Sequence, residues 1–219
     1  MTSFEYLPLT GNKQLRFADA ARIVSLLDGG DLAVLPTETG YMIAADATNV
    51  EAITKVFTAK ERNFANPMHV ACGSLAMAGR YAQLTPATVR LMGAFTPGPL
   101  TVVVPMTRLL PDTLVTKDGT VGIRVPDHPA TLQVVELLGR PVTATSLNRS
   151  GEESAPLERP YLESLTWPVT ETVVAVVEDK TSITESRPST LAAVSGADLR
   201  ILRDGPVTLA DIERVLRLR

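Results

Sequence analysis

The segment DLAVLPTETGYMIAADA, residues 31–47, decides the fold, because polar residues interrupt an apolar pattern there at one point. Its first six residues follow the helix stop Gly29-Gly30 and predict a buried β-strand. The polar run from Thr37 to Gly40 comes next, and then apolar residues resume. Active sites in layered folds gather where strands end and loops begin. We therefore expect this strand to end at a ligand site.

The composition is that of an ordinary globular domain, with 219 residues, 45% hydrophobic and 21% charged. This length favours a single domain over residues 1–219. The formal charge of −3 and the pI near 5.5 argue against a broad basic surface for a nucleic-acid backbone. No stretch approaches the ~18 apolar residues of a membrane span, and no basic region precedes a long apolar run at the N-terminus. We expect a cytoplasmic location without membrane contact.

Cysteine and histidine are scarce, which limits the chemistry. Cys72 is the single cysteine, so an internal disulfide is impossible, and its apolar neighbours indicate a small buried residue. His69 and His128 are too few and too far apart in the sequence to suggest a zinc site. The sequence therefore predicts no resident metal.

Helical and strand patterns alternate along the chain, which predicts a layered sheet with helices packed on it. The polar, proline-bearing segment 151–169 predicts a surface loop. Helices are expected in FADAARIVSLLDGG (17–30), NVEAITKVFTAKE (49–61), TPATVRLMGAF (85–95), HPATLQVVELLG (128–139) and TLADIERVLRL (208–218). Strands are expected in PMHVACGS (67–74), LTVVVP (100–105), TVGIRVP (120–126), RPVTATS (140–146), ETVVAVVE (171–178) and STLAAV (189–194).

Polar residues near the ends of these elements are hydroxyls, amides and cations, without a carboxylate pair or a Ser-His-Asp set. Such a group suits a polyanion together with a small polar molecule, because hydroxyls and amides orient a ligand while Arg and Lys neutralise phosphate charge. The group comprises Thr37, Glu38, Thr39, Lys60, Arg62, Asn66, Thr120, Arg124, Ser146, Asn148, Ser189 and Thr190.

Arg124 is the most informative member of this group. Other members can be explained as turn hydroxyls or solvated helix ends, but Arg124 interrupts VGIRVP, a strand pattern that could otherwise be buried. A buried charge requires a partner. A ligand carboxylate, a phosphate or a buried Asp would each serve.

An ordered set of motifs covers nearly the whole chain, from about residue 20 onward: PTETGY, KER, NPM, PGPLTVVV, VGIRVPDHP, TSLNRSG, PSTL and ILRDG. In this order they resemble the YrdC-like family, the threonylcarbamoyl-AMP synthases. The resemblance implies an α+β protein with the three-layer YrdC/RibB-like fold, in which a twisted mixed β-sheet is flanked by helices around a concave, positively charged cavity. It also implies ATP, L-threonine and bicarbonate as substrates, with Mg²⁺ accompanying the nucleotide.

The resemblance implies roles for individual residues as well. Lys60 and Arg62 would be the catalytic cations that hold the phosphates. The residues implied for L-threonine are Thr39, Arg124, the backbone of Ala144, Ser189 and His69. Those implied for ATP are Lys60, Arg62, Asn66, Thr120, Ser146, Asn148, Ser154 and Arg203.

The implied chemistry passes through a carbamate. The threonine amine captures bicarbonate, and a carbamate oxygen attacks the α-phosphorus and expels pyrophosphate. Catalysis would consist of positioning and charge neutralisation, which agrees with a site that lacks an acid/base pair. The product would pass to a separate tRNA-modifying transferase complex that makes threonylcarbamoyladenosine (t6A).

The chain departs from the family pattern at a few positions. Gly40, Met42 and Ala44 replace Val and two Gly, and Ala71 stands where relatives carry a histidine, with His69 two positions earlier. These departures leave two alternatives open. One is a nucleotide-binding paralogue with a different amine or carbamoyl substrate. The other is a non-enzymatic module with weak RNA binding, which the acidic charge and the few aromatic residues disfavour.

Overall fold

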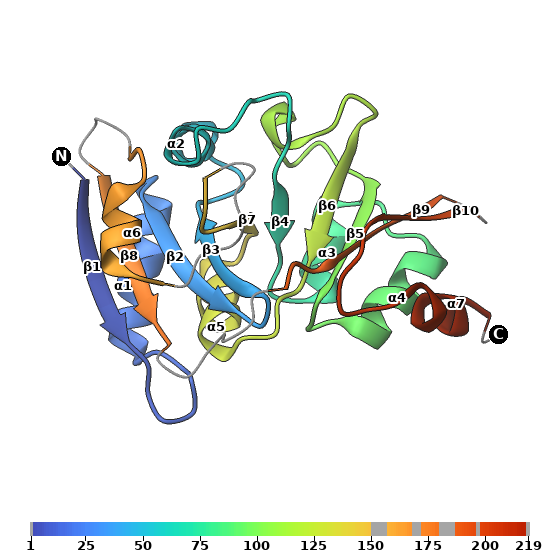
Figure 1. Ribbon diagram of the computed structural model, residues 1–219, viewed down its shortest axis with the longest axis horizontal. Helices are drawn as coiled ribbons and strands as arrows, with labels where there is room; N and C mark the ends of the chain where they lie inside the picture. Colours follow the sequence, from blue (N-terminus) through green and yellow to red (C-terminus); the bar gives the residue numbers. More distant parts are fainter. Residues whose placement is uncertain (1, 150–156, 168–171, 180–186, 196–197, 218–219) are drawn as a thin grey trace.

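The structure is a computed structural model and describes residues 2–149, 157–167, 172–179, 187–195 and 198–217. Within these ranges ten strands form one mixed sheet in the order β1-β8-β2-β3-β7-β4-β6-β5-β9-β10 (Figure 1). The strands are β1 (Thr2–Pro8), β2 (Leu32–Thr37), β3 (Gly40–Ala44), β4 (His69–Ala71), β5 (Leu100–Pro105), β6 (Thr120–Arg124), β7 (Val142–Ser146), β8 (Thr172–Glu178), β9 (Thr190–Ser195) and β10 (Asp198–Arg203).

Helices cover both faces of this twisted sheet. The helices α1 and α5 pack on each other and on β2, while α4 packs against β5 and α7 (Figure 1). The helices are α1 (Phe17–Asp28), α2 (Val50–Ala59), α3 (Leu75–Tyr81), α4 (Pro86–Phe95), α5 (Pro129–Leu138), α6 (Arg159–Ser164) and α7 (Leu209–Arg217), with a short 3₁₀ helix at Asp112–Leu114. The predicted α+β class, a mixed sheet flanked by helices, is confirmed.

Side chains of β1 alternate between the two faces of the sheet, as in any strand. On one face, the Tyr6 ring lies under the guanidinium of Arg159 from α6, with Cζ 3.9 Å from the ring centroid. On the other face, Glu5 forms an ion pair with Arg22 of α1 at 3.2 Å. The helices α1 and α6 therefore cover opposite faces at this edge.

All predicted helices and strands are present, most with small shifts at their ends. Of the segment 67–74, only His69–Ala71 form a strand, and the chain then leaves the sheet. The strands β1, β3 and β10 and the helices α3 and α6 were not predicted. The prediction of a surface loop over 151–169 is wrong for α6, because Leu162 and Leu165 are buried against the core. A six-residue helix is too short to show helical periodicity in the sequence, which explains the error.

The polar run in the opening segment is the tip of a β-hairpin. Strands β2 and β3 are buried throughout and pair in antiparallel fashion up to Thr37 opposite Gly40, so that Glu38 and Thr39 form a two-residue turn. The Thr37 hydroxyl donates to the Gly40 carbonyl at 2.6 Å and accepts the Thr39 amide at 3.2 Å. Gly40 has φ +123°, a conformation that favours glycine. The core is interrupted there because the chain reverses direction.

Candidate functional site

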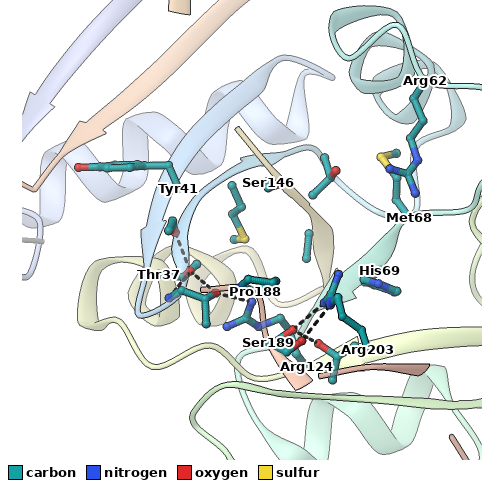
Figure 2. Close-up of a pocket in the computed structure, with 16 residues that line it drawn as sticks. Thr37, Tyr41, Arg62, Met68, His69, Arg124, Ser146, Pro188, Ser189 and Arg203 are labelled. Carbon is teal, nitrogen blue, oxygen red and sulfur yellow. Dashed lines mark hydrogen bonds between the residues drawn. The ribbon is translucent and has the colours of Figure 1, made fainter. Parts of the chain in front are cut away.

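The hairpin tip opens onto a cavity of about 140 Å³ (Figure 2). Its wall is completed by side chains from β4, β6 and β7, by the segment before β9, and by the end of β10. The lining residues are Thr37, Thr39, Gly40, Tyr41, Met42, Arg62, Met68, His69, Thr101, Arg124, Ala144, Thr145, Ser146, Pro188, Ser189 and Arg203. The structure thus brings together eight residues implied by the motifs: Thr39, Arg62, His69, Arg124, Ala144, Ser146, Ser189 and Arg203.

Arg124 is the most buried cation of the cavity, with 8% of its surface exposed. Its Nη2 donates to Oε1 of Glu38 at 2.6 Å, and its Nη1 donates to the Thr39 hydroxyl at 2.9 Å. Its Nε is buried and has no hydrogen-bond partner among the described residues. Burial lowers the pKa of Arg124, and Glu38 opposes that shift. The partner of Arg124 that the sequence left open is Glu38, and one donor, Nε, has no acceptor in the part of the chain that the structure describes.

Glu38 holds the hairpin tip against the segment that follows β6. While its Oε1 accepts from Arg124, its Oε2 accepts the backbone amide of Asp127 at 2.9 Å. Sequence reasoning noted Glu38 as a polar residue at a strand end and assigned it no role. The sequence did indicate that a buried Arg124 needs an acidic partner. It does not show which acidic residue lies next to Arg124 in the folded chain.

Arg203 is fixed to the segment that precedes β9. Its Nε donates to the Ser189 carbonyl at 3.0 Å and its Nη2 donates to the Ser189 hydroxyl at 3.1 Å. The Ser189 hydroxyl also lies 2.8 Å from that of Thr101. Burial and the neighbouring Arg124 lower the pKa of Arg203. Two guanidinium groups thus share one side of the cavity.

Arg62 reaches the cavity from the opposite side because of the way α2 ends (Figure 2). Glu61 adopts φ +50°, its amide donates to Thr58, and the Arg62 amide donates to the Phe57 carbonyl at 3.0 Å. This is a Schellman motif, with Glu61 where glycine is usual. Nε of Arg62 donates to the Asn66 carbonyl at 2.7 Å. Asn66 itself is exposed and lies outside the cavity wall, so its contribution here is the carbonyl that orients Arg62.

The electrostatics of the cavity favour an anion. The residues that line it include three arginines and no Asp or Glu. Burial lowers the pKa of Arg62, as it does for the other two arginines, which shows that part of their hydration is lost. Partly desolvated guanidinium groups bind carboxylates and phosphates through charge-assisted hydrogen bonds. Such a site can hold one or more oxyanions.

Lys60 lies beneath the end of β7, outside the wall of this cavity. It is 1% exposed, and its Nζ donates to the carbonyls of Ser146 and Asn148 and, at 2.9 Å, to Oδ1 of Asn148. The Ser146 hydroxyl in turn lies 2.5 Å from the same Oδ1. Lys60 therefore fixes the segment that carries Ser146 into the cavity.

A second cavity of about 500 Å³ lies beside the first and is mostly apolar. Met68 and His69 line both cavities, and Thr120, implied for ATP, lies on the second. Ser154 lies outside the described residues. The second cavity is lined by Pro67, Met68, His69, Thr85, Val103, Pro105, Leu114, Thr116, Asp118, Thr120, Val121, Gly122, Leu191, Ala193, Val194, Arg200 and Leu202.

The described residues contain no cluster of three or more His, Cys, Asp or Glu side chains able to hold a metal ion. They also contain no helix with the length and apolar character needed to span a membrane. Cys72 is fully buried, and burial raises the pKa of its thiol to about 12, so this thiol is protonated at neutral pH.

Both histidines are held in the neutral form, which predicts that the free energy of unfolding decreases at acidic pH. Burial and the surrounding arginines lower the pKa of His69 to about 3, and burial lowers that of His128 despite its contact with Asp179. When the pKa of a histidine is lower in the folded protein than its value of about 6.5 in the unfolded chain, the unfolded chain takes up a proton first as the pH falls. The free energy of unfolding therefore decreases as the pH falls below about 6.5. For His69 we expect about 1–2 kcal/mol of lost unfolding free energy between pH 7 and pH 5.

Urea unfolding at pH 7 and pH 5 measures the lost free energy of unfolding. The variant His69→Gln separates the contribution of His69 from that of the carboxylates, which also titrate over this interval. The variant should lose less stability than the wild type over the same interval. Equal losses in the two proteins would show that His69 does not carry the effect.

Comparisons with known proteins agree with the motif pattern. A model of the Sua5/YciO/YrdC family, described as "Telomere recombination", matches residues 25–205. A putative threonylcarbamoyl-AMP synthase of Mycobacterium tuberculosis is 32% identical over 194 residues, which cover 88% of this chain and 87% of the relative. The threonylcarbamoyl-AMP synthase of Pyrococcus abyssi is 30% identical over 188 residues, 85% of this chain. The match spans 54% of that relative, so the chain corresponds to only about half of it.

Solved structures show the same fold. The structure of P. abyssi Sua5 complexed with L-threonine aligns with a TM-score of 0.81 and 27% identity, over 97% of this chain and 60% of that one. The structure of E. coli YciO aligns with a TM-score of 0.78 and 22% identity, over 94% of this chain and 97% of that one, a likeness of fold alone. Given the family match over most of its length, the chain belongs to the Sua5/YciO/YrdC family.

Proposed function

We propose that the protein synthesises threonylcarbamoyl-AMP from L-threonine, bicarbonate and ATP with release of pyrophosphate, as a nucleotidyltransferase. The observation that carries the proposal is the arginine-lined cavity, in which Nε of the buried Arg124 has no hydrogen-bond partner among the residues that the structure describes. Relatives named threonylcarbamoyl-AMP synthase support the reaction, and a related structure that holds L-threonine supports the substrate. The product would serve t6A formation in tRNA by a separate transferase complex, in the cytoplasm.

The two cavities differ in size in the way that the two substrates require. Cavities that enclose drug-sized ligands measure roughly 300–1,000 Å³. At about 140 Å³ the first cavity suits a small amino acid, and at about 500 Å³ the second suits an adenosine group. In the first, Arg124 would bind the threonine carboxylate, beside Thr39, Ser189 and the backbone of Ala144.

The phosphates would lie between the two cavities, next to Arg62, Arg203 and Ser146. Thr120 would contact the nucleotide from the wall of the second cavity. Lys60 and Asn148 would act from below by holding Ser146 in place, and Asn66 would act through Arg62. Mg²⁺ would arrive with the nucleotide and be held by its phosphates, since the described residues offer no acidic cluster for it.

The proposed reaction has two steps. The threonine amine adds to bicarbonate and water leaves, which gives a carbamate. A carbamate oxygen then forms a bond to the α-phosphorus while the bond to the β-phosphate oxygen breaks and pyrophosphate departs. The protein contributes alignment and positive charge, and that charge comes from the arginines of the cavity, because His69 is neutral.

A paralogue with a different amine substrate is the second candidate. The cavity wall contains Gly40 and Met42, two positions at which this chain departs from the family pattern. A non-enzymatic RNA-binding module remains the third, and the net charge of −3 disfavours it.

A pyrophosphate-release assay with ATP, Mg²⁺ and bicarbonate across several amino acids separates these candidates. The proposal expects release only when L-threonine is present. Equal release with serine or another amine would favour the paralogue. No release with any amine, together with RNA affinity that falls steeply with salt, would favour the RNA-binding module.

Replacing Arg62 with alanine should weaken ATP binding about 10-fold or more and leave the amino-acid requirement nearly unchanged, because a charge-assisted hydrogen bond contributes about 1.5–3 kcal/mol. Calorimetric titration with ATP measures the first effect, and the KM for threonine measures the second. The control is Arg90→Ala, an exposed arginine on α4. A larger change for threonine than for ATP would contradict this assignment.

A further inference from the structure

His69 stands between the two cavities. It and Met68 are the residues that line both of them. Figure 2 shows the His69 ring between Arg62 and Met68 on one side and Arg203 on the other. A side chain in this place separates the two volumes, and its size sets how far they communicate.

The neighbouring strand leaves room for this ring because it carries a glycine. In the parallel pair of β4 and β6, Val70 lies opposite Ile123, which brings His69 next to Gly122. A Cβ added at Gly122 would lie 2.1 Å from Nδ1 of His69 and 2.9 Å from both Cε1 and Cγ. Cβ atoms in proteins essentially never lie that close to another heavy atom. The imidazole of His69 therefore fills the space that a side chain at position 122 of β6 would need.

Packing alone holds the ring in this position. Among the described residues, neither ring nitrogen of His69 takes part in a hydrogen bond or an ion pair, unlike His128, which contacts Asp179 at 3.1 Å. Met68, the other shared residue, is flexible and adapts to its neighbours. The rigid imidazole is therefore the element that gives the partition a definite shape.

We propose that His69, seated over Gly122, is a specificity-determining partition that limits the amino-acid cavity to small substrates and presents the carbamate to the nucleotide at its edge. This inference rests on the proposed function. It adds that amino-acid size is selected by the wall between the cavities, while the carboxylate is recognised by Arg124.

The test compares the wild type with His69→Ala, Gly122→Ala and His69→Gln in pyrophosphate release with glycine, serine, threonine, leucine and phenylalanine. In the wild type, threonine should exceed phenylalanine in kcat/KM by 100-fold or more. His69→Ala removes the partition and Gly122→Ala displaces it, so in each variant the ratio should fall at least 10-fold. His69→Gln, of similar volume, should retain most of the selectivity.

The outcomes separate this inference from the proposed function. If the wild type releases pyrophosphate with threonine but both alanine variants keep its selectivity, the partition is wrong and the proposed function stands. If the wild type releases none with any amino acid, the proposed function fails and the partition with it. Thermal unfolding of each variant checks that it is folded. If only one of the two alanine variants folds, that variant alone still tests the partition, because both change the position or size of the His69 side chain.

Discussion

Replacing Arg124 with alanine is expected to lower kcat/KM for the amino acid about 100-fold or more, because truncating a buried, hydrogen-bonded charge costs about 2–5 kcal/mol. Arg124 is 8% exposed and contacts the hairpin tip through Glu38 and Thr39. Within the described ranges its Nε has no hydrogen-bond partner, which leaves this donor for the carboxylate of the proposed substrate. The effect should fall on the KM for the amino acid, and ATP affinity should change much less.

Arg124→Lys controls for folding, because it retains a positive charge for Glu38 and removes the Nε donor and the planar fork. Arg and Lys are not interchangeable at such a site, so the lysine variant should fold normally and still lose at least 10-fold in kcat/KM. Steady-state kinetics with threonine and with ATP varied separately give the measurement. Full activity in Arg124→Lys, or equal effects of Arg62→Ala and Arg124→Ala on both substrates, would disprove the division of labour between the two arginines.

Replacing Lys60 with methionine should cost about 3 kcal/mol or more of unfolding free energy, since each buried acceptor left without a donor costs about 1–3 kcal/mol. Nζ of Lys60 donates to two carbonyls and one side-chain oxygen of Ser146 and Asn148. Methionine fills a similar volume without donating to any of them. Activity should fall as well, because Ser146 would no longer be fixed at the cavity.

Urea unfolding at neutral pH measures the loss, and the matched control is Lys55→Met on α2, the helix that ends just before Lys60. Lys55 donates to the Gly30 carbonyl at 2.7 Å, but its side chain is 21% exposed, so water can replace it there. We expect the control to lose less than half as much unfolding free energy. Equal losses in the two variants would contradict the structural role of Lys60. An unchanged stability of Lys60→Met together with weaker ATP binding would make Lys60 a direct phosphate ligand.

The elements that sequence reasoning found are those with a local signal. Asn49 caps α2 by accepting from the amides of Glu51 and Ala52, and Gly139 ends α5 in a left-handed conformation, as their positions predict. By contrast, β1 pairs with β8 across about 170 residues of sequence and is only partly buried, so its own residues give little sign of a strand. Long-range pairing of this kind is not visible in a local pattern.

The candidate site likewise has features that the sequence identified and features that only the folded chain shows. The ordered motifs identified Thr39, Arg124, Ser189 and Arg203, which meet in one cavity although they come from distant parts of the chain. They did not identify Glu38 as the acid that pairs with Arg124, nor the second cavity, because both depend on which side chains face each other after folding.

By itself, the sequence determined those helices and strands that carry a local signal, the end of the strand before Thr37 as the expected place of the site, and the supply of cations for an anion. Caps, periodicity and motif order lie in residues near one another, so they are visible without the fold. Only the tertiary structure decided what each cation does. Lys60 and Arg62 are two residues apart, yet the left-handed turn at Glu61 directs them differently. Lys60 turns into the protein toward carbonyls 86 and 88 residues away, and Arg62 turns into the cavity. Side-chain direction depends on the turn and on distant acceptors, which only the folded chain brings together.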